Sequence, residues 1–278
     1  MNLDNFKPHH LCATRADLAG NGELGRYVLL PGSDGRAEEL SAYFDDVKVL
    51  ESPRRHNLYL GTMTVEGQSI DVAAVASGMG CPSLDIIVNE LVALGVRRIL
   101  RVGTAGALHP RVKVGELVVG TGGVRDEHTS SMYAPLEFPA LAGLPWILAA
   151  QEVLRSNSPG TRVHFGVVHS KDSLFAREFH WGPRAQENRD YMALLSRSGA
   201  LASEMESSHL FVLGQTWTAE LTRKEDLPEN HVHTGAVLAI IGDEESFAPA
   251  EIAAMTVESA IQFSLATLSR LALSEVQG

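Results

Sequence analysis

The chain has 278 residues, 45% of them hydrophobic and 21% charged, enough to bury the core of one large α/β domain or two smaller ones. Its 34 acidic and 23 basic side chains give a formal net charge of −11, which argues against nucleic acid or an anionic membrane as a partner. We expect a cytoplasmic protein, because Cys12 and Cys81 form no disulfide framework, the N-terminus lacks a signal-peptide core, and no apolar run reaches membrane-spanning length.

Short apolar runs alternate with helical patterns from residue 27 to the end of the chain. In the first half, the predicted elements are a strand at 27–30, a helix at 35–44, a hairpin of 57–65 and 69–76, a helix at 82–94, and strands at 98–103 and 116–121. In the second half they are a helix at 144–155, a strand at 163–168, a helix at 184–197, a strand at 200–204, a helix at 206–217, a strand at 235–241 and a helix at 248–272. The alternation predicts a three-layer α/β/α sandwich around a twisted sheet that is mostly parallel or mixed.

Residues 219–234 are the one charge-rich interruption of this pattern, and they run from a helix end to a strand start. In α/β sheets such a connection lies opposite the carboxyl ends of the strands, where ligands bind, so we expect a surface insertion away from any site. Because no repeat, low-complexity segment or linker divides the chain, residues 1–278 are predicted to form a single domain.

The segment 98–106 places an arginine, Arg101, inside an apolar strand, shortly before Gly103-Thr104-Ala105-Gly106. A guanidinium is costly to bury unless an anion answers it. One interpretation is an oxyanion pocket at the strand end, where the glycines expose backbone N–H groups and Thr104 adds a hydroxyl donor. The other is that Arg101 pairs with a buried carboxylate and the glycines only turn the chain.

Two more strand-end turns are rich in glycine. The turn after the first strand contains Gly32 and Arg36, next to a helix N-terminus that attracts anions, and residues 77–83 form the second such turn. Another strand ends at Glu204 and Glu206; a carboxylate there can bind the vicinal diol of a sugar or serve only as a partner of the helix dipole. Three turns, two of them with arginine, favour an anion site.

Several segments occur in the order found in the nucleoside phosphorylase family, which the chain resembles over about residues 10–272, most closely in its uridine phosphorylase branch. The segments are Pro31-Gly32 with Arg36, Ser77-Gly78-Met79-Gly80 with Pro82-Ser83, Leu100 to Ala107, Glu204-Met205-Glu206-Ser207, 134–139 and 169–173. The resemblance implies phosphorolysis, in which phosphate attacks C1′ of a nucleoside and releases the free base and α-D-ribose-1-phosphate.

The resemblance also assigns the phosphate and ribose ligands. It implies that phosphate is bound by Gly32, Arg36, Arg101, Thr104 and, from a neighbouring subunit, Arg55 or Arg54. It implies that ribose is bound by Thr104, Met205, Glu206 and, across a dimer contact, His10, with Arg101 and Glu206 as the main catalytic residues. The partners are a nucleoside and phosphate. No metal or organic cofactor is expected, a monovalent-ion requirement stays open, and the assembly is a dimer-based homo-oligomer, commonly a hexamer.

The base pocket departs from the uridine phosphorylase pattern. Its expected residues are Gly106, Leu174, Phe175, Arg177 and Glu178, where the stacking phenylalanine of the family becomes Leu174 or Phe175 and its glutamine becomes Arg177 or Glu178. Asp243 is either an acid toward a purine N7 or a cap of the last helix. The alternatives to a uridine phosphorylase are a hexameric purine nucleoside phosphorylase, a nucleosidase that uses water, and a ligand-binding protein without activity.

Overall fold

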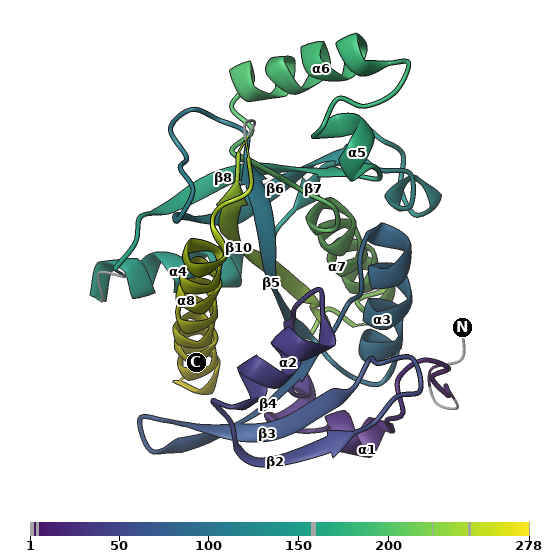
Figure 1. The fold of residues 1–278 in the computed structure, drawn as a ribbon. Coiled ribbons are helices and arrows are strands. Elements are labelled where there is room, and N and C mark those ends of the chain that lie inside the picture. The colour runs from purple at the N-terminus through teal and green to yellow at the C-terminus, as the bar shows by residue number, and fades with distance from the viewer. Residues whose placement is uncertain (1–2, 4–5, 157–159, 224, 244–245, 278) are drawn as a thin grey trace.

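A mixed sheet with helices on both faces organises the molecule (Figure 1). The computed structural model describes residues 3, 6–156, 160–223, 225–243 and 246–277. The strands are β1 (Tyr27–Leu30), β2 (Asp45–Leu50), β3 (Leu58–Val65), β4 (Gln68–Val75), β5 (Arg98–Ala107), β6 (Leu117–Asp126), β7 (Ala140–Leu141), β8 (Val163–Lys171), β9 (Ala202–Glu204) and β10 (His233–Gly242). The helices are α1 (Arg15–Leu18), α2 (Asp34–Ser41), α3 (Cys81–Ala93), α4 (Leu144–Ser156), α5 (Leu174–Arg177), α6 (Ala185–Arg197), α7 (Ser207–Leu221) and α8 (Ala250–Gln277), with 3₁₀ turns at Gly22–Leu24, Ser130–Met132 and Pro228–Asn230.

The strands join in the order β10-β6-β8-β9-β5-β1-β4-β3-β2, and β7 pairs with β6. Because β10 also pairs with β5, the strands β5, β10, β6, β8 and β9 close into a ring. The β1–β4, β1–β5, β5–β10, β6–β8 and β8–β9 pairs are parallel. The predicted α/β/α sandwich with a mixed sheet is confirmed. The ring was not predicted, because it depends on pairings between strands that are far apart in the sequence.

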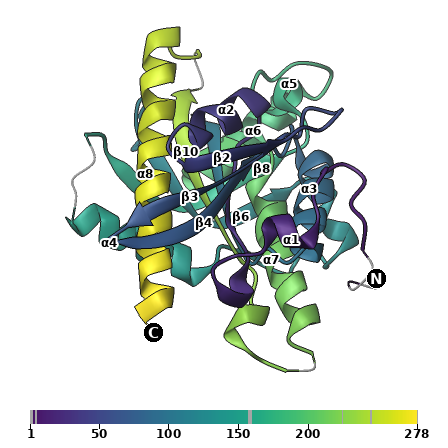
Figure 2. The same ribbon diagram turned by 90° about the horizontal axis from the view of Figure 1, so that it is seen from below.

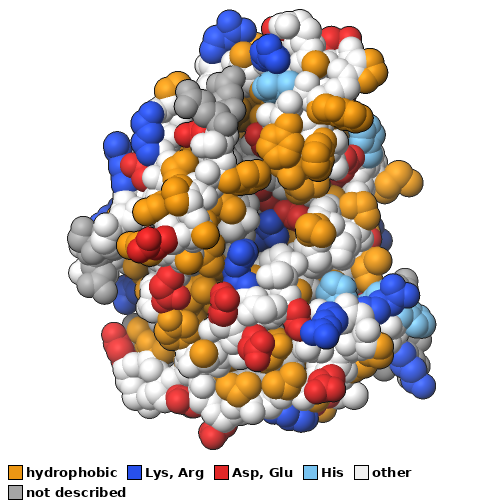
Figure 3. All heavy atoms as spheres, in the orientation of Figure 1, with side chains coloured by type: hydrophobic (Ala, Val, Ile, Leu, Met, Phe, Trp, Pro, Cys, Tyr) orange, Lys and Arg blue, Asp and Glu red, His pale blue; other side chains and the backbone are white. Residues whose placement is uncertain are grey.

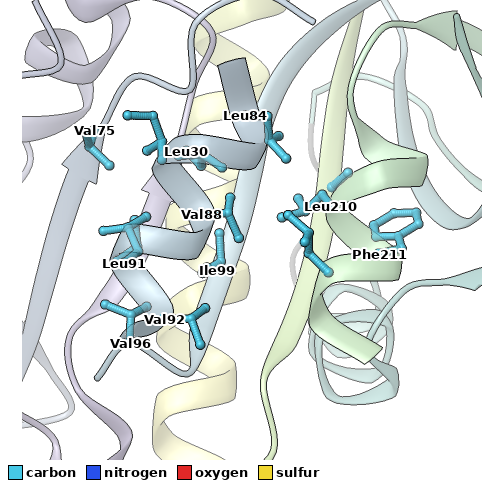
Figure 4. Close-up of a cluster of buried hydrophobic side chains, with 14 of the residues drawn as sticks. Leu30, Val75, Leu84, Val88, Leu91, Val92, Val96, Ile99, Leu210 and Phe211 are labelled. Atoms are coloured by element: carbon cyan, nitrogen blue, oxygen red, sulfur yellow. The ribbon is translucent and has the colours of Figure 1, made fainter. Parts of the chain in front are cut away.

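Alternate side chains of the central strands enter two hydrophobic cores, one on each face of the sheet. In β1, Val28 and Leu30 join the core under α3 and α7, whereas Tyr27 and Leu29 join the core under α2, α4 and α8. Figure 4 shows the first of these cores, where side chains of α3 and α7 meet Ile99 of β5. Burial on both faces explains why β1 is an uninterrupted apolar run.

The last helix, α8, is an exception to the expectation that no run reaches membrane-spanning length, since by length and composition alone it could cross a membrane. It lies on the opposite side of the sheet from α3 and α7 (Figures 1 and 2) and packs on α4 and β10. Its side chains Ile261, Phe263 and Leu268 are buried in the second core. This packing identifies α8 as a core helix.

Three of the elements that differ from the prediction are β5, α5 and β2. β5 continues to Ala107 instead of ending at 103, and residues 174–177 form the short helix α5. β2 was not predicted; Val47 and Val49 alternate with polar residues there, but the run is short and its side chains are nearly all exposed. The first two differences change the site, because both segments border it.

Residues 219–234 join the end of α7 to the start of β10. His233 is in register with Arg98, the first residue of β5, and Nε of Arg97 donates to the carbonyl oxygen of Glu229 at 3.0 Å. The connection therefore lies at the edge of the sheet where β5 and β10 begin, opposite their carboxyl ends.

His233 makes folding stability sensitive to acid. Burial, together with the charges of Arg98 and His231, lowers the pKa of His233 from 6.5 to about 4. The unfolded chain therefore binds a proton at this residue at a higher pH than the folded chain, so stability falls as the pH drops from about 6.5 to about 4. We expect a loss of about 3 kcal/mol across this interval from this residue. Urea unfolding along a pH series measures the free energy of unfolding. That free energy should fall less on acidification for His233→Gln than for the wild type or for His9→Gln, which removes an exposed histidine. Equal slopes of the free energy against pH in all three proteins would contradict the assignment.

Candidate active site

A cavity of about 490 Å³ opens at the carboxyl ends of β1, β5, β9 and β10. Its volume lies within the range of roughly 300–1,000 Å³ that is typical of small-molecule sites. In Figure 3, basic and acidic side chains lie inside a hollow on this face, beside a group of hydrophobic side chains. The polar lining comprises Arg36, Arg101, Thr104, Lys171, Glu178, Ser203, Glu204, Glu206, Asp243 and Ser246, and the apolar lining Met79, Ala105, Leu174, Phe179, Met205, Ile241 and Phe247.

Arg101 is the centre of a buried charge network on β5. Its side chain is buried; Nε lies 3.2 Å from Oε2 of Glu204, and Nη2 donates to Oε2 of Glu206. Among the described residues, Nη1 of Arg101 has no hydrogen-bond partner. The pairing with a buried carboxylate is confirmed, and the oxyanion pocket stays a prediction. Arg101 neutralises two carboxylates, and it keeps one nitrogen for a further anion.

Gly103 allows this guanidinium to lie along its own strand. A Cβ at position 103 would come within 3.1 Å of Nε of Arg101 and 2.9 Å of a methyl group of Leu238. Residues 103–107 continue the strand by pairing with β10 and β9, which corrects the predicted turn. Close packing against Arg101, rather than a change of chain direction, explains the glycine.

The two glutamates after β9 have different roles. Glu204 accepts hydrogen bonds from the backbone N–H groups of Glu206 and Ser207 at the start of α7, so it is the partner of the helix dipole. Burial alone would raise the pKa of Glu204, but Arg101 and these N–H groups hold it below its ordinary value. Burial raises the pKa of Glu206, and the charge of Glu204 adds to this shift against the opposing effect of Arg101. Both carboxylates line the cavity, and Glu206 accepts fewer hydrogen bonds than Glu204 does.

The glycine-rich turn after β4 binds Glu206 rather than an external anion. The N–H of Gly80 donates to Oε1 of Glu206 at 2.6 Å. The φ angles of Gly78 and Gly80 are 75° and 81°, and a Cβ on Gly78 would lie 2.0 Å from Oγ of Ser83, so this turn requires glycine. A carboxylate has about four acceptor positions, so Glu206 can still accept hydrogen bonds from two hydroxyl groups.

Arg36 is the second cation of the cavity and extends from the first turn of α2. Among the described residues it makes no hydrogen bond or ion pair, and Gly32 lines the cavity beside it. Burial, followed by the neighbouring charge of Arg101, lowers the pKa of Arg36. A bound anion would relieve the repulsion between these two guanidinium groups, and Thr104 lines the same cavity.

The predicted base pocket is only partly at the cavity. Gly106, Leu174 and Glu178 line it, whereas Phe175 and Arg177 do not. Phe175 is 63% exposed, which corrects its predicted place at the base. The local pattern could not distinguish these residues, because the direction of each side chain depends on how the one-turn helix α5 sits over β5.

Aromatic surface at the cavity comes from two residues that were not predicted. Phe179 lies edge-on to Phe175, with ring centroids 5.3 Å apart, and Phe247 lies edge-on to Phe179 at 6.0 Å. Both Phe179 and Phe247 line the cavity. Phe179 lies two residues after α5 and Phe247 lies three residues before α8, and neither position carried a recognisable spacing.

Arg177 is directed to a structural cluster. Its Nε lies 2.7 Å from Oδ2 of Asp126, its Nη1 donates to Asn188 at 2.6 Å, and its guanidinium carbon is 4.4 Å from the ring centroid of Tyr191. These contacts join α5 to β6 and α6. Arg177 therefore stabilises the wall of the site, which corrects its predicted role in base binding.

Lys171, at the end of β8, lines the cavity but was not among the predicted site residues. It is 2% exposed, lies 2.6 Å from Oε1 of Glu178 and donates to Oγ of Ser203 at 2.8 Å. A basic residue at the end of an apolar strand was the signal that identified Arg101, and the same signal was present here.

Asp243 lines the cavity at the end of β10. Its Oδ1 accepts from the N–H of Ser246 at 3.1 Å, and its own N–H donates to the carbonyl oxygen of Ser246 at 3.0 Å. Since α8 begins at Ala250, Asp243 caps a turn ahead of the helix rather than the helix itself.

His10 and Arg55 do not line the cavity of their own chain. Nδ1 of His10 lies 2.9 Å from Oε1 of Glu90 on α3, and this carboxylate also accepts from the N–H groups of residues 9–11. Arg54 and Arg55 are exposed, and Arg55 has a φ of 60°. Hydrogen bonds to Glu90 hold the segment around His10 in place. Since neither His10 nor Arg55 lines the cavity of its own chain, each could contribute only to the site of another chain.

Comparisons with known proteins agree on one family. The profile of the phosphorylase superfamily matches residues 26–216. The chain is 34% identical over 224 residues to the uridine phosphorylase of Treponema pallidum (strain Nichols), covering 80% of this chain and 79% of that protein. It is 30% identical over 199 residues to the uridine phosphorylase of Thermococcus kodakarensis, covering 70% of each.

A solved structure shares the fold. The crystal structure of a uridine phosphorylase from Vibrio fischeri ES114, in complex with 6-hydroxy-1-naphthoic acid, superposes with a TM-score of 0.73 over 97% of both chains at 24% identity. At this identity the likeness shows the fold alone.

Proposed function

Because the chain belongs to the phosphorylase superfamily, as its sequence motifs predicted, we propose that it catalyses the phosphorolysis of uridine to uracil and α-D-ribose-1-phosphate. It is then a pentosyltransferase. One observation carries the proposal: Arg36, Arg101 and Glu206 line a single cavity. Cations that can bind an anion and a carboxylate that can bind a diol therefore lie together.

The geometry suits attack of phosphate on C1′. Arg36 and the free Nη1 of Arg101 would hold the phosphate, with Thr104 as a further donor, while Glu206 accepts hydrogen bonds from the ribose hydroxyls. A phosphate oxygen forms the new bond to C1′ as the bond from C1′ to the base breaks and its electron pair moves to the base. Positive charge grows on the ribose ring in this step, where the carboxylate of Glu206 and the phosphate stabilise it.

A nucleosidase that uses water is less well supported. A hydrolase has little use for a second cation at the cavity next to Arg101, and among the described residues the half-buried Arg36 makes no hydrogen bond or ion pair, with only the charge of Glu39 to offset that of Arg101. The direct test is a panel of purine and pyrimidine nucleosides, ribo and deoxy, assayed for release of free base with and without phosphate. Base release that does not depend on phosphate would refute phosphorolysis.

Arg36→Ala should raise the KM for phosphate about 10- to 100-fold, because it removes a charge-assisted contact to the dianion. Thermal stability should hardly change, since the side chain has no ion-pair partner among the residues that the structure describes. Initial rates at varied phosphate and at varied uridine measure the two KM values separately. Arg184→Ala removes an exposed arginine that pairs with Glu187 and is the matched control. A rise confined to the KM for uridine would contradict the role of Arg36.

We also propose that the enzyme works as a dimer-based cytoplasmic oligomer in nucleoside salvage, with His10 and Arg55 completing a neighbouring subunit's site. Neither residue lines the cavity of its own chain, and Arg55 is exposed, which supports this arrangement. Phosphate is the co-substrate, and we propose no metal or organic cofactor. Among the described residues, no three His, Cys, Asp or Glu side chains are grouped to hold a metal ion.

A further inference from the structure

A buried carboxylate on α3, outside the cavity, holds the start of the chain. Glu90 is 5% exposed, and it accepts from the backbone N–H groups of His9, His10 and Leu11 at 2.8, 3.1 and 2.8 Å. Its Oε1 also lies 2.9 Å from Nδ1 of the His10 ring. Burying a carboxylate is costly unless donors satisfy it, and four donors converge on this one.

The contact with the His10 ring is not needed to anchor this segment. Leu11 is 2% exposed and lies in the core under α3 and α7, as do Ala13 and Leu18. The backbone N–H groups alone give each oxygen of Glu90 a donor. Because apolar burial and backbone contacts already hold the chain, the contact with the imidazole calls for another explanation.

Glu90 fixes the protons of the His10 imidazole. Burial alone would raise the pKa of Glu90, but the His10 ring and the backbone N–H groups hold it below its ordinary value, so the carboxylate is ionised. An ionised carboxylate only accepts, so Nδ1 carries a proton and, in the neutral ring, Nε2 is an acceptor. Among the described residues Nε2 has no hydrogen-bond partner, and the side chain is 25% exposed. The ring therefore keeps one acceptor for a further donor.

The loop between β2 and β3 is tied to the same segment. Oγ of Ser52 donates to the carbonyl oxygen of His10 at 2.9 Å, and Cε1 of His56 lies 3.5 Å from where a Cβ on Gly78 would stand. We call residues 9–11 and 52–56 the arm. Gly78 lines the cavity, whereas none of the arm residues, all of which the structure describes, does so. In a two-fold symmetric pair a surface meets its own copy, so an arm that borders one cavity can reach the other.

We propose that Glu90 is a positioning residue: through Nδ1 of His10 it holds Nε2 ready to accept a hydrogen bond from the 5′-hydroxyl of a nucleoside in a neighbouring subunit's cavity. This proposal rests on the function and the oligomer proposed above. The hydroxyl follows by elimination. Glu206 is proposed to accept from the two hydroxyls of the ribose diol, and a ribonucleoside has one other sugar hydroxyl, at C5′.

Glu90 orders the ring before a ligand arrives. Without the carboxylate, the imidazole can turn about its side-chain bonds and Nε2 can carry the proton. Binding would then have to order the ring and leave that nitrogen unprotonated. This cost falls only on nucleosides that have a 5′-hydroxyl, since others make no contact with the ring. Loss of Glu90 should therefore act selectively.

The first test compares uridine with 5′-deoxyuridine, which lacks only that hydroxyl. In the wild type, kcat/KM for uridine should exceed that for 5′-deoxyuridine by at least about 10-fold. Glu90→Gln leaves one acceptor oxygen for four donors, so it should lower kcat/KM about 10-fold for uridine and less than about 3-fold for 5′-deoxyuridine, as His10→Ala should. The double variant should lose no more than His10→Ala, because Glu90 acts through that ring. Equal losses for the two nucleosides in Glu90→Gln indicate a merely structural role and would overturn the proposal.

Mixed oligomers test whether Glu90 acts on another subunit. Glu90→Gln leaves the cavity of its own subunit intact, whereas Glu206→Gln leaves its arm intact. The two variants are produced together with different tags and purified through both, so that a mixed dimer holds one site with an intact cavity and an intact arm. Its kcat/KM for uridine should be at least about 5-fold above the mean of the two parent oligomers. A mixed oligomer no faster than that mean would place the effect of Glu90 in its own subunit and refute the proposal.

Glu90→Asp replaces Glu90→Gln if the latter does not fold. Aspartate keeps the charge for the backbone N–H groups but is shorter by one methylene, so it withdraws from the ring and should also reduce the preference for uridine. Glu23→Gln, at an exposed glutamate, is the control.

The two proposals fail in different ways. No phosphate-dependent cleavage of any nucleoside by the wild type would refute the proposed function. Phosphorolysis by the wild type, with the same uridine-to-5′-deoxyuridine ratio in the Glu90 variants or in His10→Ala, would leave that function standing and overturn the role of Glu90.

Discussion

Arg101→Ala is expected to lower kcat/KM for phosphorolysis by at least about 10³-fold and the free energy of unfolding by about 3–5 kcal/mol. The activity is lost because the substitution removes the cation between phosphate and Glu206. Stability is lost because Glu204 and Glu206 would remain buried without the guanidinium that neutralises them. Steady-state rates and urea unfolding measure the two effects on the same preparation.

Arg36→Ala provides the contrast for this prediction. Both arginines line the cavity, but among the described residues only Arg101 pairs with carboxylates, so Arg36→Ala should lose phosphate affinity while keeping its stability. If Arg101→Ala unfolds at the same urea concentration as the wild type, the two carboxylates do not depend on Arg101. If it retains activity, the phosphate assignment is wrong.

Glu206→Gln should lower kcat/KM for uridine about 10³-fold and that for 2′-deoxyuridine about tenfold less, because the deoxy sugar lacks one of the two hydroxyls that we propose the carboxylate binds. Glutamine keeps an oxygen for the N–H of Gly80 but turns its NH2 group toward Arg101, so the variant also loses the ion pair with that residue. Burial and the charge of Glu204 raise the pKa of Glu206, so removing its charge should cost less stability than Arg101→Ala. Rates for both nucleosides, compared as a ratio, give the readout.

Glu204→Gln is the matched control for the diol assignment. Glu204 binds the N–H groups at the start of α7, so its loss should destabilise the fold and reduce the rates for both nucleosides by the same factor. An identical loss for uridine and 2′-deoxyuridine in Glu206→Gln would contradict diol binding. The raised pKa also predicts that wild-type activity declines on the acid side at a higher pH than an ordinary glutamate would give.

Local sequence was sufficient for most of the elements and for the family. The apolar runs and turn residues located most strands and helices, since burial on both sheet faces leaves a continuous hydrophobic signal in each central strand. Arg101 was identified because a cation in such a run is costly and needs a partner. The ordered motifs indicated the family. Gly78 and Gly80 have positive φ angles, which few other residues adopt, and Glu206 accepts a hydrogen bond from the N–H of Gly80.

The partners of each charged group were decided by the tertiary structure. Arg101 is separated from Glu204 and Glu206 by about a hundred residues in the sequence, and only the pairing of β9 between β5 and β8 brings them together. In the same way, the packing of α5 between Asp126 and β5 turns Arg177 away from the cavity and Glu178 toward Lys171. Residue spacing specifies which side chains share a strand or a helix face, whereas contacts between distant segments depend on how the sheet closes.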